Sequence, residues 1–96
     1  MINTKFYGTE VPDKQQEFED NLRKMWGNYP EDIKYFPLNG EDQRELYHVI
    51  NTTVWVFWPE RYERKIVRIT GREGEFEPAK SKMEEITGIK LIEIKR

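Results

Sequence analysis

The chain has 96 residues, no cysteine and a net charge of −2, and 35% of its residues are charged. This length allows one domain over residues 1–96 with a modest core. The lack of cysteine excludes a disulfide framework, a thiolate metal site and a cysteine nucleophile, and the negative net charge disfavours a general phosphate binder.

The sequence has neither the pattern of a secreted protein nor that of a membrane protein. Its first ten residues contain no basic segment followed by an apolar run, and the longest apolar stretch, VWVFW at 54–58, is far too short to span a bilayer. We therefore expect a cytoplasmic protein. The dense mixture of Lys and Glu resembles the surfaces of thermophile proteins.

The first predicted element is a helix over 13–27. One apolar stripe at helical spacing indicates it, formed by Phe18, Leu22, Met25 and Trp26. Asp13 and Gln16 are spaced as a capping box, and Gly27 is a stop signal.

Two strands are predicted next, over 33–38 and 46–58. Pro37 indicates that the first is an edge strand, and Asn39–Gly40 predicts the turn between them. The second is rich in β-branched and aromatic residues and ends before Pro59. Its apolar end fits a buried central strand, or a strand with a functional aromatic face where Trp55 or Trp58 stacks on bases.

The segment 60–70 allows two interpretations. Tyr62, Ile66 and Ile69 have helical spacing, and Pro59 can begin a helix, but KIVRIT is rich in strand formers. After it, a helix over 77–87 is predicted from Ala79, Met83 and Ile86 with Gly88 as its cap, and then a strand from Ile89 to Lys95.

The predicted fold is therefore α+β, in one of two orders. If 60–70 is a helix, the order is α-β-β-α-α-β. If it is a strand, the order is α-β-β-β-α-β.

The helical alternative resembles the type II KH domain, a nucleic-acid-binding module with a three-stranded sheet and helices on one face. The residues that carry the resemblance are IVRITG, the G-x-x-G loop at Gly71–Gly74, PAKSKMEEI, Thr87–Gly88 and IKLIEI. The resemblance implies a loop that clamps about four nucleotides of single-stranded RNA or DNA, with RNA favoured.

Site residues follow from this resemblance. Gly71 and Gly74 would form the clamp, and Arg72 would reach a phosphate. Flanking cations would be Arg68, Lys80 and Lys82. The alternative for Gly71–Gly74 is an ordinary turn between a strand and the last helix.

A second class of function is a protein-interaction or inhibitor module, or a homodimer without nucleic-acid binding. It would use an acidic surface that includes Glu41, Asp42 and Glu45. An enzyme is not expected, because His48 is the single histidine, Ser81 is the single serine and no catalytic pattern surrounds either. No metal site and no cofactor are expected.

Overall fold

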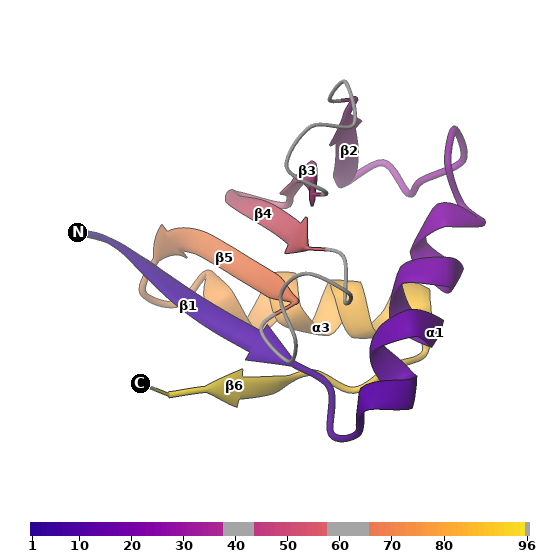
Figure 1. Cartoon of the computed structure of the whole chain (residues 1–96). Coiled ribbons are helices and arrows are strands. Elements are labelled where there is room, and N and C mark those ends of the chain that lie inside the picture. Colours follow the sequence, from indigo (N-terminus) through magenta and orange to yellow (C-terminus); the bar gives the residue numbers. More distant parts are fainter. Residues whose placement is uncertain (38–43, 58–65, 96) are drawn as a thin grey trace.

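The computed structural model describes residues 1–37, 44–57 and 66–95. Its elements are β1 (Ile2–Gly8), α1 (Pro12–Arg23), β2 (Ile33–Phe36), β3 (Arg44–Val49), β4 (Thr52–Phe57), β5 (Val67–Arg72), α3 (Phe76–Thr87) and β6 (Ile92–Ile94). The strands form one antiparallel sheet in the order β2-β3-β4-β5-β1-β6 (Figure 1). The α+β class expected from the sequence is confirmed.

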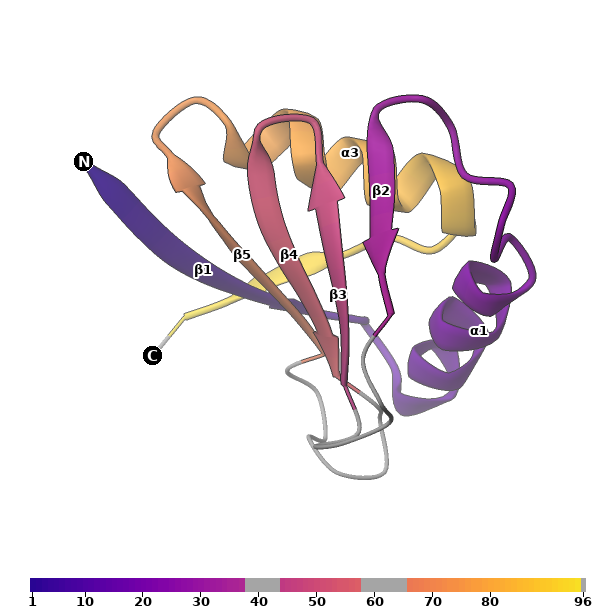
Figure 2. The same ribbon diagram turned by 90° about the horizontal axis from the view of Figure 1, so that it is seen from above.

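The helices of the described residues, α1 and α3, pack on one face of the sheet (Figure 2). Figure 2 shows α3 running across the strands and α1 beside β2. Successive strand residues point to opposite faces, so every second residue enters the core. The buried side chains include Val54, Val56, Val67 and Ile69 from the sheet, Phe18 and Leu22 from α1, and Phe76, Ala79 and Met83 from α3.

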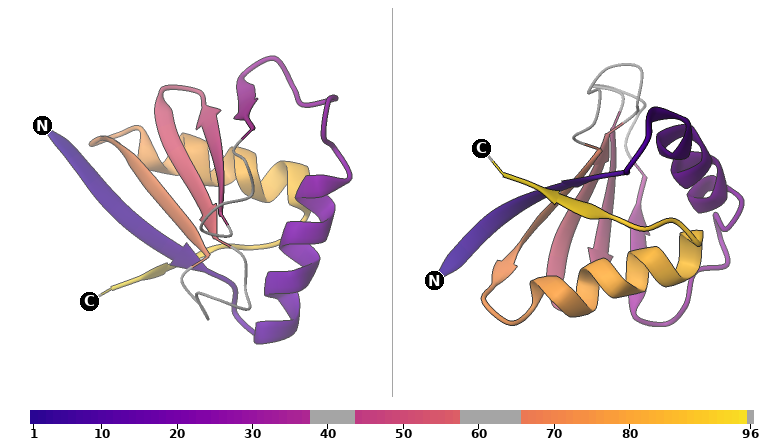
Figure 3. Two further views of the ribbon diagram at one scale, coloured as in Figure 1. Left: turned by 45° about the horizontal axis from the view of Figure 1, so that its top comes forward. Right: turned by 90° about the horizontal axis from the view of Figure 1, so that it is seen from below.

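The two helices meet at the end of α3, as Figure 3 shows. The side-chain amide of Asn21 donates to the Thr87 carbonyl at 2.7 Å. Gly88, with φ of 72°, ends α3. The predicted helix over 77–87 and its glycine cap are therefore confirmed, and this cap also anchors α1. The closing strand is shorter than expected, with β6 covering Ile92–Ile94.

The first helix differs from its prediction at both ends. It starts at Pro12 after the N-cap residue Val11, with no side-chain cap, so the capping box of Asp13 and Gln16 is wrong. It ends at Arg23 rather than at residue 27. Trp26 lies beyond it, where the indole stacks on Tyr35 with ring centroids 5.3 Å apart.

The described part of the strand predicted over 46–58, residues 46–57, forms a hairpin rather than one strand. β3 and β4 pair in register across a turn at Ile50 and Asn51, and Ile50 has a φ of 57°. The Thr52 hydroxyl donates to the Val49 carbonyl at 2.8 Å beside this turn. The single-strand prediction failed because strand propensity does not mark a reversal, and Asn51 was the one local signal for a turn.

The described part of the ambiguous segment is a strand. β5 pairs with β4 through Val56–Val67 and Thr53–Thr70, and it pairs with β1 on its other side. The helix over 60–70 is therefore wrong for residues 67–70, and residues 60–65 lie outside the described ranges. The order α-β-β-α-α-β with a three-stranded sheet is wrong as well. Val67 and Ile69 are two residues apart and both reach the core, as expected for a strand with one covered face.

Neither predicted order included β1. This strand lies between β5 and β6, with Phe6 opposite Arg68 on one side and opposite Ile94 on the other. Tyr7 of β1 is buried, and burial raises the pKa of its phenol to about 12. The polar residues Asn3, Thr4 and Lys5 hid the strand, because they weaken its apolar signal.

Candidate nucleic-acid interface

The face of the sheet turned away from the helices, here called the open face, carries the second set of strand side chains. They are Ile2, Thr4, Phe6, Lys34, Phe36, Arg44, Leu46, His48, Thr53, Trp55, Phe57, Arg68, Thr70, Arg72, Ile92 and Ile94. Among these outward positions of the described strands, four are Lys or Arg and none is Asp or Glu. Because side chains alternate between the two faces of each strand, the open face is basic although the net charge of the chain is −2.

One row of paired residues crosses the open face. The paired positions run Phe36, Leu46, Trp55, Arg68, Phe6 and Ile94, from β2 to β6. Phe36 is 45% exposed at one end of the row. A second row beside it carries hydrogen-bonding groups, namely Lys34, His48, Thr53, Thr70 and Thr4. The face thus offers rings, cations and hydroxyls together.

Trp55 holds two arginines at the centre of the open face. The guanidinium carbon of Arg44 lies 4.4 Å from the ring centroid of Trp55, and that of Arg68 lies 5.7 Å away. Arg68 also lies 5.6 Å from the ring of Phe57, which is 7% exposed. Such cation–π contacts hold a guanidinium in place, so less side-chain entropy is lost when it binds an anion.

The charge of Arg68 has no counter-charge among the described side chains. In the described ranges no carboxylate forms an ion pair with it, and its Nε is buried without a hydrogen-bond acceptor. Because Nε is buried, a ligand oxygen would accept from the terminal N–H groups of this guanidinium, and such a charge-assisted hydrogen bond is favourable. Arg68 and Trp55 were both expected from the sequence to contact nucleic acid, and the structure brings them together on the open face.

The predicted clamp glycines lie at the junction of β5 and α3, where Gly71 is a residue of β5 opposite Asn3 of β1 and Gly74 lies in the turn before α3. A Cβ on Gly71 would meet the Thr52 methyl group at 2.9 Å, and Gly74 has a φ of 89°. The Arg72 N–H already donates to Glu75 Oε1 at 2.6 Å. Close packing and turn geometry therefore account for both glycines, and the turn interpretation is confirmed. The Glu75 carboxylate therefore already accepts a hydrogen bond from the Arg72 N–H, one of the backbone donors that a phosphate clamp needs.

Lys80 and Lys82 lie on α3, on the far side of the sheet from Trp55. Lys80 Nζ is 3.6 Å from Glu84 and 3.9 Å from Glu77. Lys82 Nζ is 3.2 Å from Asp32, and this hydrogen bond raises the pKa of the ammonium group. Carboxylates compensate both lysines, so they do not join Arg68 in one binding surface.

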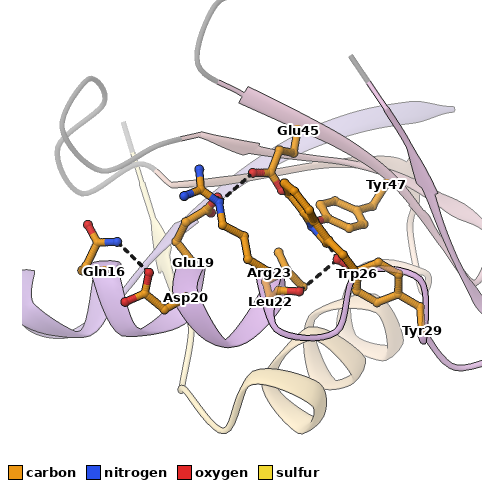
Figure 4. A network of polar contacts seen from close by, with 9 residues as sticks. All are labelled: Gln16, Glu19, Asp20, Leu22, Arg23, Trp26, Tyr29, Glu45 and Tyr47. Atoms are coloured by element: carbon orange, nitrogen blue, oxygen red, sulfur yellow. Dashed lines mark hydrogen bonds and ion pairs between the residues drawn. The ribbon is translucent and has the colours of Figure 1, made fainter. Parts of the chain in front are cut away.

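Glu45 was expected on an acidic surface, and this is wrong. Its side chain faces α1 in the interior and is 4% exposed. The Tyr47 hydroxyl donates to Glu45 Oε2 at 2.8 Å, and Arg23 Nε lies 3.4 Å from Glu45 Oε1 (Figure 4). Sequence reasoning placed Glu45 in a solvated acidic run, whereas the register of β3 turns it inward. Glu41, Asp42 and Trp58 lie outside the described residues.

A second buried carboxyl group faces this network. Glu19 on α1 is 2% exposed, and Arg23 Nε lies 3.1 Å from its Oε1. Burial, and then the neighbouring Glu45, raise the pKa of Glu19 to about 9. Glu19 is therefore protonated at neutral pH, which removes one negative charge from the interface between α1 and β3.

The residues that the structure describes contain neither a metal-binding cluster nor a membrane-spanning helix. No group of three or more His, Asp or Glu side chains is placed to hold a metal ion. No helix in the same ranges is both long and apolar enough to cross a bilayer.

Several residues of the open face were missed by sequence reasoning, notably Thr4, Phe6, Phe36 and Arg44. Phe6 and Thr4 could have been found from the period-two pattern of Ile2, Thr4 and Phe6. Arg44 carries no local signal, because its place beside Trp55 depends on the pairing of β3 with β4.

No protein-family model, curated protein or solved structure matches this chain. Its function must therefore be inferred from the geometry and charge of the open face.

Proposed function

We propose that this protein is a small non-catalytic domain that binds single-stranded nucleic acid through the open face of its sheet. The observation that carries the proposal is the cluster of Arg44, Trp55 and Arg68 on a face with four basic side chains and no acidic one among its described strand positions. The function is the one implied by the sequence resemblance, but the binding surface differs from a G-x-x-G groove.

Charge and shape both favour a single strand. The guanidinium groups of Arg44 and Arg68 can each donate two hydrogen bonds to a phosphate. Exposed rings such as Phe36 can stack on bases, which are accessible only when they are unpaired. A duplex hides its bases, so it could use the cations of this face but not its rings.

The proposal is tested by fluorescence anisotropy with a labelled single-stranded oligonucleotide. If the four basic residues each neutralise one phosphate, the slope of log K against log salt is about −3, at roughly −0.7 for each contact. Arg68→Gln should weaken binding about tenfold, because a charge-assisted contact to phosphate is worth about 1.4 kcal/mol.

Lys90→Gln is the matched control. Lys90 is exposed in the segment after α3, away from the open face, and its substitution removes the same charge. We expect less than a twofold change for this variant. Absence of binding at low salt would refute the proposal, and so would equal losses for the two variants. Capture of a protein partner without any oligonucleotide binding would favour the interaction module instead.

A further inference from the structure

A hollow on the open face lies beside the Trp55 cluster, over β5, β1 and β6. Its volume is about 720 Å³, which lies within the range of about 300–1,000 Å³ usual for small-ligand sites. The side chains that line it include Phe6, Ile94, Thr4, Thr70, Arg68 and Lys95. Arg68 belongs both to this hollow and to the Trp55 cluster, so a ligand can contact the two places at once.

The lining of the hollow matches the parts of one nucleotide. Phe6 and Ile94 are paired neighbours and give an apolar floor for a base. Arg68, which points from the open face, can contact phosphate oxygens. Glu93 also lines the hollow, but it is opposite the buried Tyr7, so its side chain lies on the covered side of the sheet, where its Oε1 is 3.7 Å from Lys5 Nζ.

The hydroxyl pair of Thr4 and Thr70 lies in the same hollow. The two Oγ1 atoms are 3.1 Å apart and exposed. Two hydroxyls have two donors and four lone pairs, and their mutual bond uses one of each. One donor and three lone pairs remain, so the pair can both donate to and accept from a ribose 2′-hydroxyl, the group that distinguishes RNA from DNA.

We propose that this hollow is a ribonucleotide subsite, in which the Thr4–Thr70 pair contacts the 2′-hydroxyl and makes the open face prefer RNA to DNA. The inference rests on the proposed function. Phe6 and Trp55 lie on strands separated by β5, about 10 Å apart at the usual strand spacing. Arg68 lies between them in the row, where it can hold the phosphate that links the nucleotide in the hollow to its neighbour.

The test compares oligouridylate with oligodeoxyuridylate, which differ only in the 2′-hydroxyl. The wild-type chain should bind the RNA about three- to tenfold more tightly, as expected for one neutral hydrogen bond. Thr4→Val and Thr70→Val should lower RNA affinity to the DNA level and leave DNA affinity unchanged. Valine keeps the shape of threonine and suits a strand.

Thr53→Val is the matched control. Thr53 is exposed in the same row, opposite Thr70, but it does not line the hollow. It should change neither affinity. If RNA and DNA bind equally with the same dependence on Arg68, or if Thr53→Val acts like Thr70→Val, the subsite is refuted while the proposed function stands. If neither oligonucleotide binds, both are refuted.

Discussion

The two faces of the sheet have opposite chemistry, although the same strands build both. On β5, Ile69 is buried in the core while its neighbours Arg68 and Thr70 reach the open face. On β4, Val54 and Val56 are buried on either side of Trp55. The comparison teaches that an acidic chain can present a basic surface, because alternation sorts its charges by face rather than by position in the sequence.

The largest expected difference between the two faces is in how much a leucine contributes to the free energy of unfolding. One leucine on each face tests it. Leu22→Ala should lower the free energy of unfolding by about 2–5 kcal/mol, because Leu22 is fully buried against the covered face. Leu46→Ala, on the open face, should cost about 1 kcal/mol, since Leu46 is only partly buried. Urea unfolding of both variants gives the two values. Equal losses would mean that the open face is covered in solution.

Protonation of Glu19 gives the next largest effect. The folded chain keeps this proton up to about pH 9, whereas the unfolded chain releases it near the ordinary value of 4.5. Rising pH between these values therefore favours unfolding. Glu19→Gln cannot ionise, so it should be more stable than the wild type by on the order of 1–3 kcal/mol at pH 8. Thermal unfolding from pH 5 to pH 9 measures it.

Glu17→Gln is the control for Glu19→Gln, because Glu17 is exposed on the same helix and is not among the groups that shift the pKa of Glu19. Its unfolding curve should keep the pH dependence of the wild type. A flat pH dependence in the wild type itself would contradict protonation of Glu19 in the folded state.

Packing of Gly71 against Thr52 gives a smaller effect. Gly71→Ala should cost about 1–2 kcal/mol, because the new Cβ would press on the Thr52 methyl group. Thr52→Ser removes that methyl and keeps the hydroxyl that donates to Val49. The double variant should recover most of the loss made by Gly71→Ala. Urea unfolding of the wild type, the two single variants and the double variant measures these losses. If Gly71→Ala costs as much stability in the Thr52→Ser background as in the wild type, this packing role is disproved.

The smallest effect is expected from the lysines of α3. Lys80→Gln should change oligonucleotide affinity by less than twofold, because Lys80 is on the covered side and paired with Glu77 and Glu84. The anisotropy assay proposed for Arg68→Gln measures it. A tenfold loss here would restore the G-x-x-G surface as the binding site.

Much of the fold was predictable where the local sequence pattern agreed with the tertiary structure. The stripe of Ala79, Met83 and Ile86 and the Gly88 cap defined α3, and Phe18 and Leu22 marked the buried side of α1. The sequence left two interpretations open for 60–70, because Ile66 and Ile69 fit a helical spacing as well as a strand, and the strand is correct for residues 67–70. Short apolar runs carry both periods, and pairing with β4 decided between them.

The candidate site was predictable only in part. Trp55 and Arg68 were anticipated as nucleic-acid contacts, but the resemblance to a KH domain grouped Arg68 with Lys80 and Lys82 around the G-x-x-G loop. The sheet separates them, since α3 covers one face and Arg68 points from the other. Arg44 joins Trp55 through a pairing between strands, and no single segment encodes that neighbourhood.

The sequence by itself determined the α+β class, the last helix, and the supply of aromatic and basic residues, because composition and local periodicity act over a few residues. Only the tertiary structure decided which of those residues meet. Strand register sets the face of every side chain, and a shift of one residue would exchange Arg68 for Ile69 on the open face. The proposed binding surface therefore depends on the pairing of β4, β5 and β1.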